Sequence, residues 1–292
     1  MRLGTVNAGG GREIVAQVDG EIVSVTAADP GLGGSIQQLL QQGEEGLGRV
    51  QRALQNPARR MLYKREQLGP AVADPGKILC IGKNYAEHAA ELGSDIPTKP
   101  EVFLRTRTSL AGPYEPVRRP RVSEQMDYEV ELGVVIGRAG RYISEARALE
   151  HVAGYCVFND ISIRDFQRFG QQWTPGKNFD RSGPLGPFLV TRDEIPDPQD
   201  LGLSTTVLKT TGEEEVLQQS HTSLMVYPVV SLIEFLSSFT TLEPGDLIAT
   251  GTPGGVGDGR RPPRWLRPGE TVICRVEGIG NLENPVVAEP VA

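Results

Sequence analysis

Histidine and cysteine are both scarce in this chain of 292 residues, which contains three of each. The histidines are His88, His151 and His221. No two of them have the spacing of paired metal ligands, which argues against a zinc site. The cysteines are Cys80, Cys156 and Cys274. Because they are odd in number and dispersed through apolar stretches, we expect buried, reduced thiols in a cytoplasmic protein.

Long apolar runs and an excess of positive charge are also missing. No run approaches the roughly 18 apolar residues of a membrane span, and the first twenty residues lack the apolar core of a secretory signal. Lysine plus arginine number 30 against 37 aspartates and glutamates, a formal net charge of −7. This balance disfavours a broad nucleic-acid footprint. We therefore expect neither a membrane nor a nucleic acid among the partners, whereas an anionic small molecule stays possible.

Turn-forming residues, by contrast, are plentiful, with 35 glycines and 22 prolines. Such a composition is typical of a β-rich body. Residues 1–27 alternate as short strands around a turn at Asp19-Gly20, and residues 35–56 have helical spacing. A Pro/Gly-rich connector follows at residues 68–77. The predicted division is a small N-terminal α/β domain over residues 1–70 and a larger domain over residues 71–292.

The larger domain has the pattern of a strand-rich α+β body with long loops. Strands are predicted at residues 77–82, 101–105, 127–137, 152–159, 186–191, 202–210, 246–250 and 271–276. Helices are predicted at residues 86–93, 143–151, 160–169 and 228–238. The basic segment GRRPPRW, residues 259–265, is expected to be an exposed loop.

The segment DYEVELGVVIG, residues 127–137, places two glutamates in a strand-like run. Because side chains alternate between faces along a strand, Glu129 and Glu131 share one face and apolar residues occupy the other. The apolar positions are Tyr128, Val130, Leu132, Val134 and Ile136. Two like charges in a buried strand repel each other and require a cation. A solvated strand face is the alternative.

A third carboxylate follows a neighbouring apolar stretch. Asp160 comes directly after residues 152–159, at a strand end where a side chain can point into a cleft. With the two glutamates it would complete an all-oxygen set that suits Mg²⁺, Mn²⁺ or Ca²⁺. If Asp160 opens a helix, Arg164 and Gln167 lie on one face of it. A capped surface helix would show the same pattern.

Three further segments contain residues that could take part in a reaction or bind a substrate. On a helix, His88 and Glu91 would lie one above the other, so the carboxylate could orient the imidazole as a general base. Lys177 stands between turn residues, where it could stabilise an oxyanion. The glycine-rich turn after residues 246–250 contains Thr252 and could hold an anion. A surface ion pair, a surface lysine and a plain turn are the respective alternatives.

Taken together and in this order, these segments resemble the fumarylacetoacetate hydrolase (FAH) family, including its acylpyruvate hydrolase and 2-hydroxyhepta-2,4-diene-1,7-dioate isomerase members. The resemblance covers roughly residues 77–287. It rests on IGKNYAEHAAE, DYEVELGVVIG, GYCVFNDISIRD, GKNFDRSGPLGP, LEPGDLIATGTPGGVG and LRPGETVICRVEGIGNLENPV.

The resemblance implies a catalytic domain built as a mixed β-sandwich roll, a homodimer and a Mg²⁺ or Mn²⁺ ion. The implied metal ligands are Glu129, Glu131 and Asp160. The implied catalytic residues are His88 and Glu91, on a segment that often closes as a lid, and Lys177. The implied substrate contacts are Arg164, Gln167 and Thr252. Arg105-Thr106 departs from the Lys-Pro of many relatives. Arg105 is expected among the distal substrate contacts, so the departure leaves the substrate open.

The implied reaction is hydrolysis of a carbon–carbon bond in a 2,4-diketo acid, with water activated by His88 and a metal-stabilised enolate as product. The same site would also suit isomerisation, tautomerisation or decarboxylation of a 2-oxo acid. A catalytically idle metal-binding protein is the remaining alternative, although binding alone would not require the histidine–glutamate pair.

Overall fold

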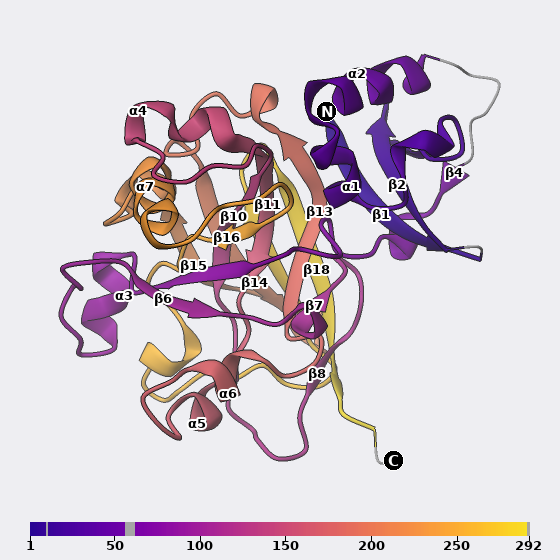
Figure 1. The fold of residues 1–292 in the computed structure, drawn as a ribbon. Helices are drawn as coiled ribbons and strands as arrows, with labels where there is room; N and C mark the ends of the chain where they lie inside the picture. Colours follow the sequence, from indigo (N-terminus) through magenta and orange to yellow (C-terminus); the bar gives the residue numbers. More distant parts are fainter. Residues whose placement is uncertain (10, 56–61, 291–292) are drawn as a thin grey trace.

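The computed structural model describes residues 1–9, 11–55 and 62–290. It is a strand-rich α+β structure organised around two large sheets (Figure 1). The larger sheet has eleven strands, of which ten run in the order β4-β3-β2-β1-β13-β11-β10-β16-β5-β6. Among the described residues, no helix has both the length and the apolar character that a membrane crossing requires.

The N-terminal part of the large sheet is an antiparallel meander. Its strands are β1 (Arg2–Ala8), β2 (Gly11–Val18), β3 (Glu21–Ser24) and β4 (Leu62–Tyr63). The predicted turn at Asp19-Gly20 joins β2 to β3, and both residues have positive φ (51° and 84°), as a tight hairpin turn requires. The predicted helical stretch is two helices, α1 (Ile36–Gln41) and α2 (Gly43–Leu54), and residue 56 lies outside the described part.

The meander joins the rest of the sheet through β1, which pairs antiparallel with β13 (Gly183–Thr191). Beyond β13 lie the strands that position the site. They are β11 (Val152–Asn159), β10 (Val130–Ile136), β16 (Leu247–Ala249), β5 (Ile78–Gly82) and β6 (Glu101–Leu104), with β7 (Leu110–Ala111) beside β13. The division into domains at residue 70 stays a prediction, since one sheet runs across that point.

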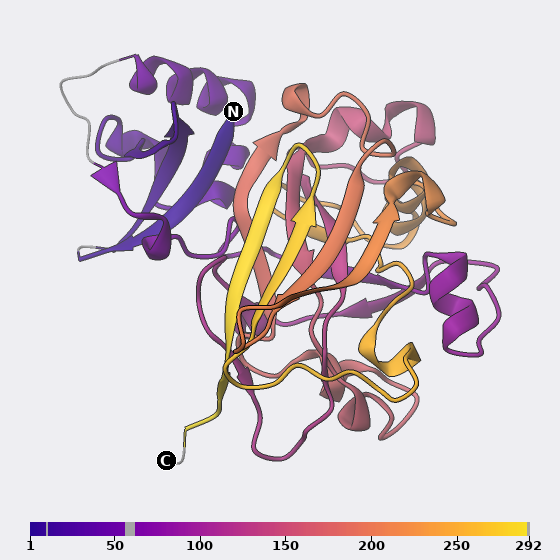
Figure 2. The same cartoon turned by 180° about the vertical axis from the view of Figure 1, so that it is seen from behind.

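A second sheet packs on one face of the first (Figure 2). Its strands, in spatial order, are β15 (Glu214–His221), β14 (Gly202–Leu208), β17 (Thr271–Val276), β18 (Gly280–Ala288) and β8 (Val117–Arg119). The alternation of β10 separates two cores. Val134 packs in the cluster shared with β14 and β17, whereas Val135 packs in the cluster shared with α1 and α2. Every residue of β10 is therefore buried.

Short elements surround the sheets. The remaining helices are α3 (Ala86–Glu91), α4 (Glu145–Ala148), α5 (Arg164–Gln167), α6 (Thr174–Lys177) and α7 (Val229–Phe239). The 3₁₀ turns are Pro30–Leu32, Arg65–Gln67, Arg107–Ser109, Leu149–His151, Arg192–Glu194, Thr222–Leu224 and Gly257–Gly259. A small ribbon pairs β9 (Met126–Asp127) with β12 (Ser162–Ile163).

The predicted helix over residues 160–169 is wrong in its first half. Residues Ser162 and Ile163 form β12 instead, and α5 begins only at Arg164. Pairing of β12 with β9 holds this stretch extended. The tertiary hydrogen bonds thus override the local helical pattern.

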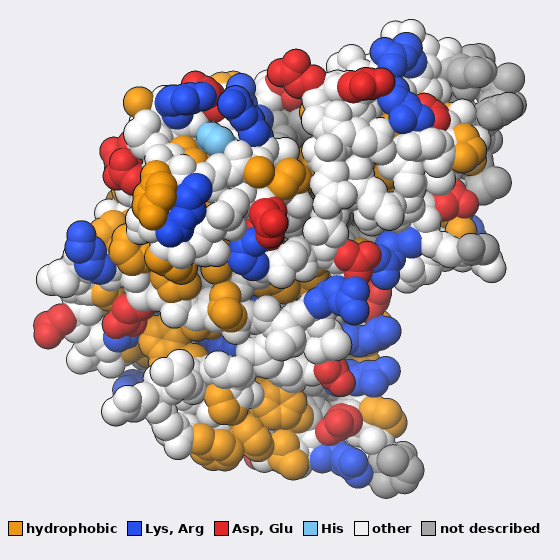
Figure 3. All heavy atoms as spheres, viewed as in Figure 1, with side chains coloured by type: hydrophobic (Ala, Val, Ile, Leu, Met, Phe, Trp, Pro, Cys, Tyr) orange, Lys and Arg blue, Asp and Glu red, His pale blue; other side chains and the backbone are white. Residues whose placement is uncertain are grey.

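Hydrophobic side chains gather over the lower part of the face seen in Figure 3, in the region of α5 and α6. The exposed apolar residues of the neighbouring elements include Leu104 and Phe169. The homodimer expected from the sequence stays a prediction.

Candidate active site

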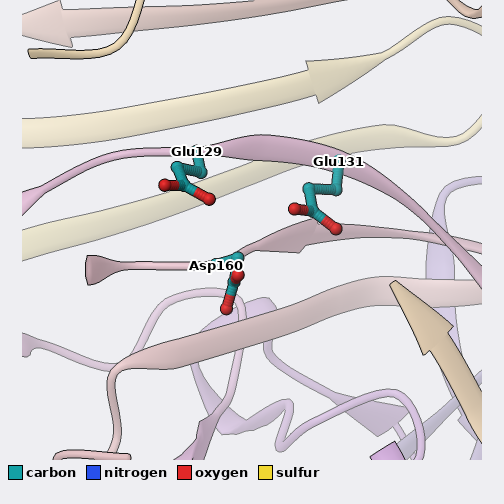
Figure 4. A group of neighbouring side chains, drawn as sticks. All are labelled: Glu129, Glu131 and Asp160. Atoms are coloured by element: carbon teal, nitrogen blue, oxygen red, sulfur yellow. The ribbon is translucent and has the colours of Figure 1, made fainter. Parts of the chain in front are cut away.

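Three carboxylates converge in the structure where the start of β10 pairs with the end of β11 (Figure 4). Glu129 and Glu131 flank Val130, which pairs with Asn159, the last residue of β11. Asp160 follows at once, and its backbone N–H donates to the carbonyl of Glu129 at 2.9 Å. This register brings one oxygen from each carboxylate within 4.8 Å of the others. All three side chains are buried.

Basic side chains neutralise two of these carboxylates. Lys177 Nζ, at the end of α6, lies 2.8 Å from Glu129 Oε2 and 2.5 Å from Asp160 Oδ2. Arg164 forms an ion pair with Glu129 (2.7 Å), and Arg105 contacts Asp160 Oδ1. Burial alone would raise the pKa of Glu129, but Lys177 and Arg164 outweigh it and lower the pKa to about 2.

Glu131 is the unneutralised member of the group. Its Oε2 accepts a hydrogen bond from the backbone N–H of Gly251 at 2.9 Å, and no basic side chain of the described residues forms a salt bridge with it. Burial, and then the charges of Asp160 and Glu129, raise the pKa of Glu131 well above its usual range. The ionised form of Glu131 is therefore disfavoured in the site as it stands, and a divalent cation would supply the positive charge that stabilises this form.

The chemistry of the donors fits such a cation. Carboxylate oxygens are the ligands preferred by hard divalent ions such as Mg²⁺ and Mn²⁺. The group of Glu129, Glu131 and Asp160 could thus hold a divalent metal. Lys177 would have to yield part of its contact with the two carboxylates it bridges, because ammonium and metal ion compete for the same lone pairs.

A histidine–carboxylate pair lies on α3. His88 Nδ1 is 2.8 Å from Glu91 Oε1, and Glu91 Oε2 accepts the backbone N–H of Gly255 at 2.8 Å. A carboxylate at Nδ1 favours the tautomer with its proton on that nitrogen and leaves Nε2 as the base. The imidazole is buried and close enough to Glu129 to contribute to the lowering of its pKa.

The carboxylates and the histidine line one cavity of about 770 Å³, within the range of small-molecule sites. Of the residues singled out in the sequence, those on its wall are His88, Glu91, Glu129, Glu131, Asp160, Arg164, Gln167, Lys177 and Thr252. Arg105 is not on the wall of this cavity. Its buried guanidinium contacts Asp160 and Ser182, so it lies behind a carboxylate of the group, and its role as a distal substrate contact stays a prediction.

Arg164 and Gln167 reach the cavity from the single turn of α5. Arg164 Nη1 donates to Gln167 Oε1 at 2.9 Å, and its Nε donates to Asp127 Oδ2 at 2.8 Å. Asp127 also accepts the backbone N–H groups of Gly257 (2.7 Å) and Asp258 (3.0 Å). Sequence reasoning missed this aspartate, although it opens the very segment that contains the two glutamates.

Thr252 lies in the glycine-rich turn that follows β16. Its hydroxyl accepts a hydrogen bond from Gln218 Nε2 at 2.9 Å, which leaves its own proton available to a ligand. Gly251 and Gly255 have φ of +98°, a conformation that L side chains rarely adopt. The turn can therefore bring backbone N–H groups to Glu131 and Glu91 only with glycine at these positions.

The three carboxylates and the histidine–glutamate pair line one cavity on a mixed double-sheet body, and such a group of side chains could serve an enzyme that uses a divalent metal. The chain also matches a known protein family. The fumarylacetoacetate (FAA) hydrolase C-terminal family matches residues 77–287, most of the chain. The chain therefore belongs to the fumarylacetoacetate hydrolase family.

Individual relatives cover nearly the whole chain. Oxaloacetate tautomerase fahd2, mitochondrial, of Xenopus laevis is 40% identical over 273 residues, covering 93% of this chain and 84% of that protein. The fumarylacetoacetate hydrolase from psychrophilic Exiguobacterium antarcticum superimposes with a TM-score of 0.83 at 34% identity, covering 99% and 100% of the two chains. The 2-hydroxyhepta-2,4-diene-1,7-dioate isomerase from Mycobacterium marinum superimposes with a TM-score of 0.75 at 33% identity, covering 100% of both chains.

Proposed function

We propose that this protein is a metal-dependent enzyme that forms and protonates the enolate of a 2-oxo acid. The observation that carries the proposal is the convergence of the His88–Glu91 pair, the three carboxylates and Lys177 on one cavity. A protein that only bound a metal would have no use for an oriented base. The expectation of catalysis thus rests on geometry as well as on the family.

Glu129, Glu131 and Asp160 would hold the ion, for which Mg²⁺ and Mn²⁺ are the candidates. A divalent ion held there would supply Lewis-acid chemistry to the oxo group of a 2-oxo acid, whose carboxylate and oxo oxygens can act as a chelating pair. The family supports this assignment, and so does Glu131, a buried carboxyl with no basic partner among the described residues.

The chain's own residues supply the proton transfer. His88, with Nδ1 bound to Glu91, would take a proton from carbon 3 of the substrate through Nε2 and pass it to the enolate oxygen, or carry it in the reverse direction. Lys177 is buried, and Asp160 and Glu129 raise its pKa despite its burial. It therefore stays cationic and would stabilise the negative oxygen of the enolate. Thr252 would donate its hydroxyl proton to the substrate carboxylate.

Keto–enol tautomerisation of an oxaloacetate-like acid is the first candidate reaction. It needs only one proton moved between carbon 3 and the oxo group, and the tautomerase of Xenopus laevis is 40% identical to this chain. The isomerase of Mycobacterium marinum supports related proton-transfer chemistry.

Carbon–carbon hydrolysis of a 2,4-diketo acid, the reaction expected from the sequence, is the second candidate. Here His88 would deprotonate a water that adds to carbon 4, the bond between carbons 3 and 4 would break, and the enolate would take a proton at carbon 3. Its support is the similarity to the hydrolase of Exiguobacterium antarcticum.

A single panel separates these reactions. The protein, with Mg²⁺ or with a chelator, is assayed on oxaloacetate (enol content and carbon dioxide release), on acylpyruvates (pyruvate release) and on 2-oxohept-3-enedioate (isomerisation). We expect metal-dependent loss of the oxaloacetate enol. Pyruvate release alone would establish the hydrolase, and no turnover of any substrate would overturn the proposal.

A further inference from the structure

The basic loop GRRPPRW, residues 259–265, has no part in the chemistry proposed above, yet it borders the same cavity. Arg261 and Pro263 line that cavity together with the three carboxylates and His88. From the sequence, only exposure of this loop to solvent is expected. Its position raises the question of what an arginine does there.

Arg261 differs from the other lysine and arginine residues of the cavity wall because it forms no ion pair with a described residue. The other lysine and arginine residues on the wall each form an ion pair, namely Lys83 with Glu101, Arg164 with Asp127, Arg168 with Asp258 and Lys177 with Glu129. Within residues 1–9, 11–55 and 62–290, no carboxylate lies within 4.0 Å of the Arg261 guanidinium. It is thus the uncompensated cation of the cavity wall in the described part of the chain.

The guanidinium is held by one of its ends. Arg261 Nη1 donates to the backbone carbonyls of Asp258 (3.0 Å) and Arg260 (2.8 Å). No protein acceptor within the described residues is found for its Nη2 or Nε. Because an arginine fork offers five N–H donors and no acceptor, the free edge can take up the two oxygens of one carboxylate.

The loop that carries Arg261 is fixed on two sides. Asp127 accepts the N–H groups of residues 257 and 258, and Arg168, just after α5, pairs with Asp258. Pro262 and Pro263 follow directly and limit the backbone freedom of the loop. The yellow-orange loop lies between α3 and α5 in Figures 1 and 2. An arginine held in this way is placed for recognition.

The lining of the cavity differs in exposure. Glu129, Glu131 and Asp160 are buried, and we call this part the floor, whereas Arg261 is exposed to solvent, and we call that part the rim. At about 770 Å³ the cavity holds more than a chelated oxo-acid group. A molecule that fills it would have an oxo-carboxylate at the floor and a negative group toward the rim.

We propose that Arg261 binds the second carboxylate of the substrate and makes the enzyme selective for 2-oxo dicarboxylates over 2-oxo monocarboxylates. The inference rests on the proposed function only for the orientation of the ligand, with its oxo-carboxylate on the metal. Arg261 is a specificity-determining residue and takes no part in the proton transfer.

The test measures binding, so that it does not depend on which reaction the enzyme performs. Isothermal titration calorimetry on the full chain saturated with Mg²⁺ compares 2-oxoglutarate, 2-oxoadipate and 2-oxopimelate, each with the 2-oxo monocarboxylate of equal chain length. Oxalate serves as a chelator without a distal group. The variants are Arg261→Gln and, as a matched control, Arg267→Gln, an exposed arginine nearby that is not on the cavity wall.

We expect the wild type and Arg267→Gln to prefer the dicarboxylate of at least one pair. Arg261→Gln should reduce that preference about 3- to 30-fold, the range for a charge-assisted hydrogen bond at a partly solvated position, and leave oxalate affinity unchanged. Equal binding of both members of every pair by the wild type, or an unaltered preference in Arg261→Gln, would overturn the inference. Failure of the proposed function would show itself separately, as no turnover in the substrate panel.

Discussion

Glu91 accepts the backbone N–H of Gly255 through one carboxylate oxygen, 2.8 Å away, while its other oxygen lies 2.8 Å from Nδ1 of His88. One side chain thus fastens α3 to the glycine-rich turn after β16 and orients the base carried by that helix. The residue that sets the tautomer of His88 is therefore also the residue that holds its helix against the turn.

Replacing Glu91 should therefore weaken catalysis without loss of the metal. In Glu91→Gln only one oxygen remains to serve both partners, and we expect kcat to fall about 10- to 100-fold, the usual effect of losing an orienting partner of a histidine. Mg²⁺ affinity, measured by calorimetry, should stay the same. Glu87→Gln on the exposed side of α3 is the control. Equal kcat in both variants would contradict the orienting role.

His88 itself should matter more. We expect His88→Ala to lower kcat by about 10²–10⁴, the contribution of a general base, again with Mg²⁺ binding preserved. His221→Ala is a suitable control, since this imidazole is bonded to Ser223 and does not line the cavity. An unchanged rate in His88→Ala would remove the residue from the mechanism.

Glu131 is predicted to lower the stability of the metal-free protein at neutral pH and to contribute to metal binding. Its folded-state pKa is raised, so the carboxyl favours the folded state while protonated and this contribution is lost as the pH rises through that pKa. At neutral pH, Glu131→Gln should stabilise the metal-free protein by about 1 kcal/mol, or roughly 2–4 °C in Tm. Calorimetric scans with and without Mg²⁺ would show the wild type stabilised by the ion and the variant not. A lower Tm of the metal-free variant would refute this.

The pKa of Glu129 is shifted in the opposite direction, so its effect on stability depends on pH in the opposite way. Its pKa is lowered to about 2 in the folded protein, against roughly 4.3 for an ordinary glutamate. It therefore contributes stability above about pH 4.3 that is lost as the pH falls toward 2. The difference in unfolding free energy between wild type and Glu129→Gln, measured by denaturant titration without metal, should shrink over this interval. A difference that is constant from pH 6 to pH 3 would speak against it.

Asp127 is predicted to be a structural support of the site. Asp127→Asn would leave the buried guanidinium of Arg164 with Glu129 as its remaining carboxylate. We expect a loss of roughly 3 kcal/mol in unfolding free energy, the low end for a broken buried ion pair. Asp165→Asn, which affects a partly buried contact with Ser123, should cost far less. Similar losses in the two variants would argue against a special role of Asp127.

Local patterns sufficed for much of the fold. The alternation of residues 127–137 predicted a strand, and in the structure the two faces of this strand pack in different cores, with Val134 in one and Val135 in the other. The Asp19-Gly20 turn and the helix over residues 228–238 are confirmed, the latter as α7. These features depend on neighbours in the chain, which is why they can be inferred without coordinates.

Long-range pairing was harder to foresee. Ser162 and Ile163 were expected in a helix and are held extended by a strand from residues 126–127. The carboxyl group of Asp127 accepts a hydrogen bond from a loop 130 residues away in the chain, and Arg105 contacts Asp160 without lining the cavity itself. No local pattern encodes such contacts, and only the motifs of the family brought His88, Lys177 and the carboxylates together beforehand.

The ammonium of Lys177 between Glu129 and Asp160 bears on the order in which folding and metal binding occur. Since this ammonium relieves the repulsion between Glu129 and Asp160, we expect folding to be completed before any ion arrives. Loading would then be a reversible event set by the free concentration of the cation, and the same polypeptide could be emptied and refilled without unfolding.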